Sequence, residues 1–251
     1  MTNRQRSCSI NPIVIIPARL ASTRLPNKPL ADIHGVPMIV HVWRRAVEAD
    51  VGPVFVAAGD AAISDVVRSV GGNAILTDPA HISGSDRIFE ALAYVDPDGQ
   101  HDVVVNLQGD LPTIEPRALR HVTELLSSDE VDIGTLVSVI TNAKERNDPN
   151  VVKAIIAMSL DENSGRALYF TRAEAPSGPG LLYHHIGIYA YRRESLARFV
   201  ALPPGVLEQR ERLEQLRALE AGMRIDVALI KNMPLGVDTI ADLNAVRKIL
   251  K

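Results

Sequence analysis

The chain has 251 residues, of which 46% are hydrophobic and 23% are charged, a composition that is ordinary for a globular protein. A formal net charge of −3 argues against general nucleic-acid binding, which needs a strongly basic surface. The single cysteine, Cys8, excludes a disulfide within the chain and fits a reducing compartment.

The apolar runs and the first residues indicate where the protein acts. No run approaches the ~18 uninterrupted apolar residues of a transmembrane helix. Residues 1–9 carry two arginines but are not followed by the apolar region and small-residue site of a signal peptide, so we interpret them as a flexible tail. We therefore expect a cytoplasmic enzyme with no membrane partner.

Strand-like and helix-like segments alternate in the first half of the chain, which is typical of a layered α/β fold. Residues 13–16 are apolar on both faces and form the expected central strand. The other expected elements of this half are a helix at 38–49, a strand at 54–58, a helix at 61–70, a strand at 74–77, a helix capped by Ser83 or Ser85, a strand at 103–107 and a helix from about 115 to 126.

The second half of the chain is less regular. Its expected elements are strands at 133–140 and 151–158 with a turn at 147–150, a short extended segment at 167–170, a loop at 175–180, a strand at 184–191, helices at 193–200 and 207–222, a strand at 225–230 and a helix at 240–250. Thr239 and Asp242 are the expected capping box of the last helix. Without a clear linker, we expect a single domain over residues 1–251, in which residues from about 131 to 222 form a substrate lobe.

A long loop follows the first strand and carries three cations, Arg19, Arg24 and Lys28. Small residues between them would let backbone N–H groups approach a ligand closely; these are Ala18, Ala21, Ser22 and Thr23. Cations and accessible amides at the end of a strand suit a polyphosphate. Taken alone, the loop is equally compatible with an ordinary solvated basic turn.

Two more polar loops follow apolar strands, at residues 83–87 and 108–110. Ligands of open α/β sheets bind outside the carboxyl ends of the strands, so we expect the three loops to gather at one edge. Asp110 is free to face that edge, where a carboxylate near phosphates needs a bridging cation such as Mg²⁺. Asp238 could share this metal, or it could cap the helix that follows.

Several common site motifs are absent. There is no G-x-x-x-x-G-K-[ST] sequence and no G-x-G-x-x-G after the first strand, which argues against a P-loop NTPase and a dinucleotide dehydrogenase. No cluster of cysteine and histidine indicates zinc.

Six segments, in order along the chain, closely resemble 3-deoxy-manno-octulosonate (Kdo) cytidylyltransferases, the CMP-Kdo synthetases. They are residues 16–30 (IPARLASTRLPNKPL), 83–87 (SGSDR), 105–110 (VNLQGD), 185–191 (HIGIYAY), 213–217 (LEQLR) and 236–239 (GVDT). Six ordered motifs are far more specific than any one of them. The first also resembles the wider sugar-nucleotidyltransferase superfamily, including CMP-sialate synthetases.

The resemblance implies a three-layer, Rossmann-like nucleotidyltransferase fold with a mixed central sheet and a smaller sugar-binding and dimerisation lobe. It implies a Mg²⁺-dependent homodimer that converts CTP and Kdo to CMP-Kdo and pyrophosphate, for lipopolysaccharide biosynthesis. The anomeric hydroxyl of the sugar would attack the α-phosphorus in line. Positioning and Mg²⁺ would supply the rate, without a covalent intermediate.

The resemblance also implies roles for matching residues. Arg19 and Lys28 would hold the CTP phosphates and act in catalysis with Asp110, while Arg24 would assist or be structural. The rest of the implied nucleotide site is Ser22, Thr23, Ser83, Gly84 and Asp86. Asp110 and Asp238 would be the metal ligands.

The sugar acid is implied to contact residues from both halves of the chain. These are Gln108, Arg172, His185, Tyr189, Glu214 and Gln215. A cation such as Arg172 suits the sugar carboxylate. His185 could be a base or a hydrogen-bonding contact of the sugar, and we prefer the second interpretation.

Three places near the nucleotide and metal loops depart from the family's usual sequence. Leu111 stands where the family usually has Glu, and Thr113 where it usually has Leu. Asn27 replaces a usual Gly, and residues 58–60 (AGD) replace a usual Thr-Asp-Asp. These departures keep two alternatives open: the same chemistry on an amino-Kdo or sialic-type acid, and a catalytically weakened nucleotide-binding paralogue.

Overall fold

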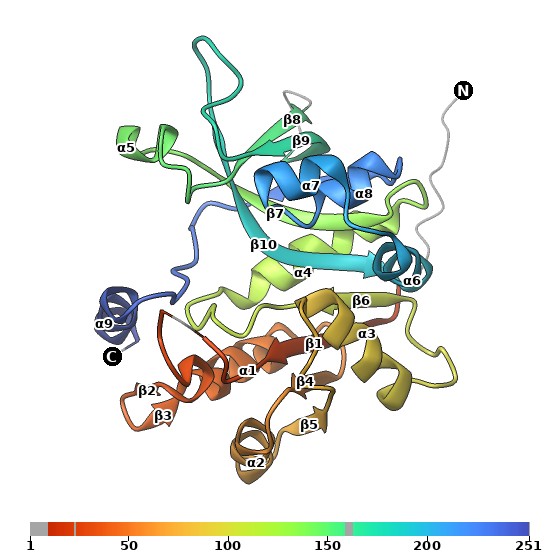
Figure 1. The fold of residues 1–251 in the computed structure, drawn as a ribbon, viewed down its shortest axis with the longest axis vertical. Helices are drawn as coiled ribbons and strands as arrows, with labels where there is room; N and C mark the ends of the chain where they lie inside the picture. Colours follow the sequence, from red (N-terminus) through yellow and green to blue (C-terminus); the bar gives the residue numbers. More distant parts are fainter. Residues whose placement is uncertain (1–9, 23, 159–162, 251) are drawn as a thin grey trace. The chain divides into compact units, whose positions relative to one another are not determined.

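The structure, a computed structural model, describes residues 10–22, 24–158 and 163–250. The chain folds into two compact units, one of residues 11–120 and 234 onward, the other of residues 121–233. We call them the first and second unit; their elements are labelled in Figure 1. Within the described ranges, no helix is long and apolar enough to cross a membrane.

A parallel sheet forms the centre of the first unit. Its strands have the order β5-β4-β1-β6, and they are β1 (Pro12–Ala18), β4 (Val54–Ala58), β5 (Asn73–Leu76) and β6 (Val103–Asn106). Every residue of β1 is buried, and β1 pairs in parallel with β4 on one side and β6 on the other. The prediction of a buried central strand is therefore confirmed.

Three helices pack on this sheet, as the apolar spacing predicts. They are α1 (Met38–Ala49), α2 (Ala61–Ser69) and α3 (Gly84–Val95). α1 contacts β1, β4 and α2, whereas α3 contacts all four strands. Further along the chain, α4 (Pro116–Glu124) leads into a 3₁₀ turn at Leu125–Ser127.

Trp43, the single tryptophan of the chain, lies where α1 meets the turn after α2. A Cβ atom added at Gly72 would come within 2.9 Å of the Trp43 ring and 2.7 Å of Val67. Gly71, with φ of 83°, takes the left-handed conformation that closes a helix. The two glycines thus let the chain turn tightly against the indole.

A small hairpin and the last helix complete the first unit. The strands β2 (Asp32–Ile33) and β3 (Val36–Pro37) pair antiparallel after a 3₁₀ turn at Lys28–Leu30. This hairpin was not predicted, because two-residue strands are too short to show a periodicity. Helix α9 (Ile240–Ile249) contacts β2, and Thr239 and Asp242 form its capping box as predicted.

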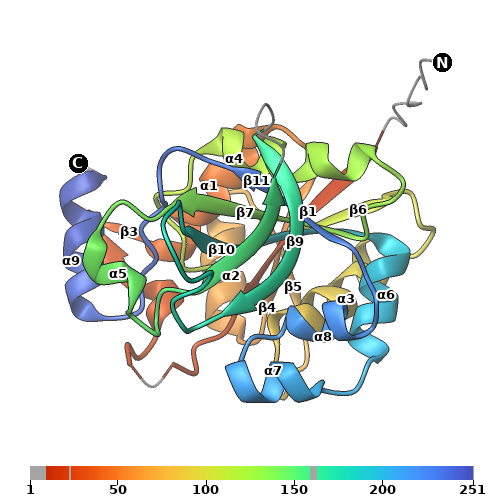
Figure 2. The same ribbon diagram turned by 90° about the horizontal axis from the view of Figure 1, so that it is seen from above.

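The second unit contains a mixed sheet (Figure 2). Its strands are β7 (Ile133–Val139), β8 (Lys153–Met158), β9 (Ser164–Thr171), β10 (Tyr183–Arg192) and β11 (Ile225–Leu229). The order is β10-β7-β11-β9-β8, with β11 parallel to β7 and the other pairs antiparallel. β8 also pairs with β10, so the ring of pairings closes.

Two details of the second unit correct the predictions. The helix expected at 207–222 is two helices, α7 (Val206–Glu211) and α8 (Leu216–Glu220), because Arg212 between them is left-handed, with φ of 55°. A short helix, α5 (Ala143–Arg146), was not predicted. The helix expected at 193–200 is confirmed as α6 (Arg193–Ala201).

Candidate active site

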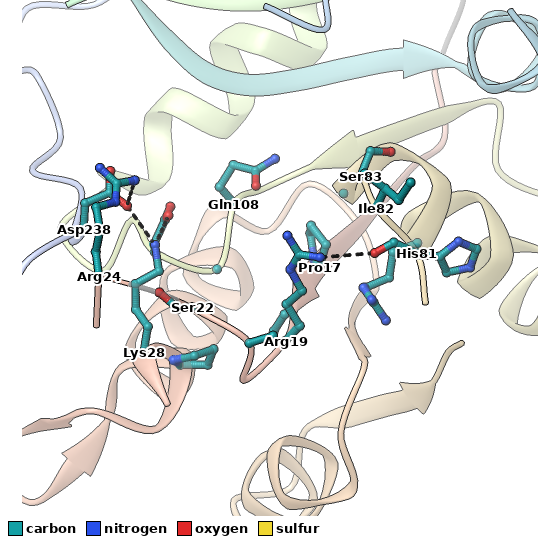
Figure 3. Close-up of a pocket in the computed structure, with 17 residues that line it drawn as sticks. Pro17, Arg19, Ser22, Arg24, Lys28, His81, Ile82, Ser83, Gln108 and Asp238 are labelled. Carbon is teal, nitrogen blue, oxygen red and sulfur yellow. Dashed lines mark hydrogen bonds and ion pairs between the residues drawn. The ribbon is translucent and has the colours of Figure 1, made fainter. Parts of the chain in front are cut away.

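Loops of the first unit line a pocket of about 340 Å³ (Figure 3). They follow β1, β5 and β6, and the segment before α9 adds to the wall. The predicted residues that line the pocket are Arg19, Ser22, Arg24, Lys28, Ser83, Gly84, Gln108, Asp110 and Asp238. The three loops therefore meet as expected, because parallel strands carry them to the same edge of the sheet.

Lys28 lies between two carboxylates. Its Nζ donates to Asp110 Oδ2 at 2.7 Å and to Asp238 Oδ1 at 3.1 Å, and Arg24 Nη2 lies 3.0 Å from the same Asp238 oxygen. Figure 3 shows Lys28 and Arg24 converging on Asp238. Burial opposes the charge on Lys28, but attraction and hydrogen bonds from Asp110 and Asp238 outweigh it and raise the pKa of Lys28 above 10.5. Lys28 is therefore a charged ammonium shared by two carboxylates.

One backbone bond and two bonds of the Thr113 side chain hold the two carboxylate loops together. Val237 N donates to Asp110 O at 3.0 Å. Thr113 Oγ1 accepts a bond from Leu235 N at 2.7 Å and donates to Leu235 O at 3.2 Å. Because these bonds join the residues beside both carboxylates, the spacing of Asp110 and Asp238 depends on them.

Asp238 is not the N-cap of α9. Thr239 takes that position, and Asp242 Oδ2 accepts bonds from the backbone N–H groups of Asp238 and Thr239 at 3.1 and 2.8 Å. The carboxylate of Asp238 is therefore left to face Lys28, and the alternative interpretation as a helix cap is wrong.

Two of the departures from the family sequence have a structural reason. Asn27 is left-handed, with φ of 55° and ψ of 29°, a conformation that Asn adopts more readily than most residues. Leu111 is buried, and a Cβ at Gly236 would lie 3.5 Å from its Cδ2. Leu111 thus packs under the Asp238 segment.

The other residues predicted to bind the nucleotide differ in their exposure and hydrogen bonds. Arg19 is exposed, and its Nη1 donates to His81 O at 3.3 Å. Ser83 caps α3 by accepting a bond from Asp86 N at 3.0 Å, and its hydroxyl donates to Asp86 Oδ2 at 2.8 Å. Asp86 does not line the pocket. Thr23 lies outside the described residues.

His81 and Arg87 also line the pocket, although they were not among the predicted site residues. Both belong to the polar loop and helix start that follow β5. Their position after a strand was a signal that could have found them. Gln108 lines the pocket too, and its Nε2 donates to Asn106 Oδ1 at 3.1 Å.

The structure places the other predicted sugar contacts in the second unit. His185 on β10 is 8% exposed, and its Nε2 lies 3.0 Å from Thr135 Oγ1. Burial, with a smaller effect of neighbouring His184, lowers the pKa of His185 to about 3. A pKa this low makes His185 a poor proton acceptor, which favours a hydrogen-bonding role over that of a base.

Arg172 is held by backbone oxygens of its own unit. Its guanidinium donates to Glu211 O, Pro149 O and Arg212 O at 2.8, 2.8 and 3.3 Å. In this conformation it organises the turn before α8, so a ligand carboxylate would share these donors with three carbonyls.

Gln215 is a buried polar residue of the same unit, and Tyr189 is a partly buried one. Gln215 is 5% exposed, and its Nε2 has no hydrogen-bond partner in the part of the chain that the structure describes. An unpaired buried amide indicates a missing acceptor. Burial raises the pKa of Tyr189 well above 10, so its hydroxyl stays protonated. Glu214 adjoins Gln215 just before α8.

The chain is similar to cytidylyltransferases over most of its length. A family model described as cytidylyltransferase matches residues 13–225. A 3-deoxy-manno-octulosonate cytidylyltransferase of Rhodospirillum centenum is 64% identical over 240 residues, which is 96% of this chain and 93% of that protein. A protein of the same name from Rhodospirillum rubrum is 58% identical over the full length of both chains.

A solved structure is also similar to this one. It is the structure of CMP:2-keto-3-deoxy-manno-octonic acid synthetase in complex with CTP, with a TM-score of 0.88 and 37% identity, covering 96% of this chain and 98% of that chain. The expected α/β nucleotidyltransferase fold is therefore confirmed.

Proposed function

Because the chain belongs to the cytidylyltransferase family, we propose that it transfers CMP from CTP to Kdo and releases pyrophosphate. The observation that carries this proposal is the pocket of the first unit, where a loop with three cations faces two carboxylates. Relatives that are named for the reaction, and a similar structure that contains CTP, support it. The product belongs to lipopolysaccharide biosynthesis.

The cations of the pocket bind the triphosphate in this proposal. Arg19 and Lys28 hold phosphate oxygens, and their charge stabilises the leaving pyrophosphate. Arg24, which already forms an ion pair with Asp238, assists in binding the phosphates. Ser22, Ser83 and Gly84 border the nucleotide.

Asp110 and Asp238 would hold Mg²⁺. They fit a hard divalent cation, because both carboxylates already share the ammonium of Lys28. No group of three or more His, Cys, Asp or Glu able to hold a metal occurs among the described residues, so the other ligands would be phosphate oxygens and water. When bound, Mg²⁺ would neutralise phosphate charge and orient the α-phosphate for attack.

The second unit supplies the sugar-acid contacts in this proposal. The unpaired amide of Gln215 donates to a sugar oxygen, and His185, whose low pKa makes it a weak base, makes a hydrogen bond rather than removing a proton. Arg172, Tyr189 and Glu214 complete the contacts of this unit. We also propose a cytoplasmic homodimer, which light scattering tests; a monomer mass would contradict the dimer.

A pyrophosphate-release assay tests the reaction. We expect release that requires CTP, Mg²⁺ and Kdo together, and slower release when UTP replaces CTP. An amino-Kdo and a sialic-type acid are the comparison substrates, and faster turnover of either would reassign the sugar. Tight CTP binding without release with any of these acids would contradict the enzyme activity.

A further inference from the structure

The hydroxyl of Thr135 lies between the backbone of β10 and the ring of His185. Thr135 belongs to β7 and is 0% exposed. Its Oγ1 lies 3.0 Å from His185 Nε2, 2.8 Å from Ile188 O and 3.2 Å from Ile186 O. The pairing of β10 with β7 shifts its register between Ile186 and Tyr189, which is a bulge in β10. At this bulge, two carbonyls of one strand therefore reach a single side chain.

These three neighbours determine where the hydroxyl hydrogen of Thr135 points. A carbonyl oxygen can only accept a hydrogen bond, and a hydroxyl has one hydrogen to donate. If that hydrogen pointed to the ring, Oγ1 would face Ile188 O across 2.8 Å with no hydrogen between the two oxygens, which is repulsive. The hydroxyl therefore donates to the carbonyls of β10, and it accepts a hydrogen bond from Nε2–H of His185.

This arrangement leaves the other ring nitrogen of His185 with a lone pair. A neutral imidazole carries one N–H, so an N–H at Nε2 makes Nδ1 an acceptor. No described residue forms a hydrogen bond with Nδ1. The ring centroids of Phe170 and Tyr189 lie 4.9 and 5.6 Å from that of His185, so the ring is packed between aromatic neighbours. His185 is thus an oriented acceptor rather than a donor.

We propose that Thr135 is a positioning residue, which keeps the proton of His185 on Nε2 so that Nδ1 accepts a hydrogen bond from a hydroxyl of the sugar acid. A lone pair at Nδ1 favours a group that carries a hydrogen, and it repels a carboxylate or a carbonyl, which have only lone pairs to offer. His185 therefore selects for a hydroxyl, and the substrate carboxylate is left to a cation. The inference rests on the proposed function, since it assumes that the sugar acid binds at His185.

Nitrogen NMR of isotopically labelled histidine measures the tautomer directly, at neutral pH and without CTP or Kdo. The signals of His185 are those that are missing from His185→Gln. We expect a pyridine-type Nδ1 and a pyrrole-type Nε2. Thr135→Val keeps the shape but leaves Nε2–H without an acceptor, so the tautomer with the proton on Nδ1 should become populated. Thr135→Ser should restore the wild-type tautomer.

The KM for Kdo measures the effect on the proposed substrate. We expect Thr135→Val to raise this KM about tenfold, with kcat and the KM for CTP within about twofold of the wild type. Thr135→Ser should return the KM for Kdo to within about twofold. Ser138→Ala is the matched control, because it removes another buried hydroxyl of β7 from the opposite face of the strand. It should change neither the tautomer of His185 nor the KM for Kdo.

A wild-type protein with the proton on Nδ1 would overturn the inference. So would a Thr135→Val variant with the wild-type tautomer or with the wild-type KM for Kdo. An equal rise of KM in Thr135→Val and Thr135→Ser would assign the effect to packing, and it would overturn the inference too. A wild-type protein that releases no pyrophosphate with Kdo would instead overturn the proposed function, while the NMR signals would still report the tautomer.

Discussion

At the scale of single residues, Lys28 links the proposed metal ligands to the loop proposed to bind phosphate. It lies between Asp110 and Asp238 while belonging to the loop that would hold phosphate. If the carboxylates take a metal, Lys28 is released toward the triphosphate. The binding of metal and CTP would then be cooperative, because each favours the arrangement that the other needs.

Asp110→Asn should lower kcat by about a thousandfold or more while leaving the fold intact, since it removes one of the two carboxylates proposed to hold Mg²⁺ but keeps the shape. Pyrophosphate release measures the rate, and circular dichroism checks the fold. Asp65→Asn, on the exposed side of α2, is the matched control and should keep full activity. Wild-type turnover in Asp110→Asn would contradict the proposed role of Asp110 as a metal ligand.

The chemical types of the site residues were largely predictable from the sequence, whereas the hydrogen-bond partners of their side chains were not. Arg19, Lys28 and Asp110 were predicted as site residues because they are charged and follow apolar strands. The order of the strands brings such loops together. Two features depend on packing between distant segments: the three carbonyls around Arg172, and the buried Nη2 of Arg87, which has no hydrogen-bond partner among the described residues. No local pattern carries that information.

At the scale of elements, Thr113 determines how the two carboxylate loops meet. Thr113→Val removes both bonds to Leu235 but keeps the volume of the side chain. We expect a rise of about tenfold in the Mg²⁺ concentration at half-maximal rate, because the carboxylates lose their spacing. The measurement is a Mg²⁺ titration of pyrophosphate release.

Thr113→Ser is the control for this prediction, since it restores the hydroxyl and should restore the wild-type Mg²⁺ requirement. Equal Mg²⁺ requirements in Thr113→Val and the wild type would show that Thr113 has no positioning role. If Thr113→Val lost only about 1 kcal/mol in its free energy of unfolding, with an unchanged Mg²⁺ requirement, this would also show that Thr113 has no positioning role.

The elements of the first unit were more predictable than those of the second. Parallel strands buried on both faces read as continuous apolar runs, and the helices between them show a clear 3.6-residue spacing. In the second unit, the helical spacing runs on past Arg212, where one left-handed residue divides the segment. Such a break is set by tertiary contacts rather than by propensity.

At the scale of the whole molecule, the buried histidine His185 makes stability depend on pH. The pKa of His185 is about 3 in the fold, against 6.5 for the free side chain. Between these values the unfolded chain binds a proton that the folded chain does not, so stability falls as pH falls below 6.5. From pH 7 to pH 5 this group should cost about 2 kcal/mol.

His185→Gln tests this pH dependence, because it keeps a polar partner for Thr135 without a titrating ring. Urea unfolding at pH 7 and pH 5 should show a smaller loss of stability in the variant than in the wild type. The same loss in both proteins would mean that His185 is protonated in the fold.

Trp43 provides a fluorescence signal that comes from the first unit alone. The single tryptophan belongs to the first unit, against Gly72, whereas four of the five tyrosines belong to the second: Tyr169, Tyr183, Tyr189 and Tyr191. Indole fluorescence therefore reports the unfolding of the unit with the pocket, and far-ultraviolet dichroism reports both units. Whether the two signals change at the same urea concentration would show directly if the units unfold as one.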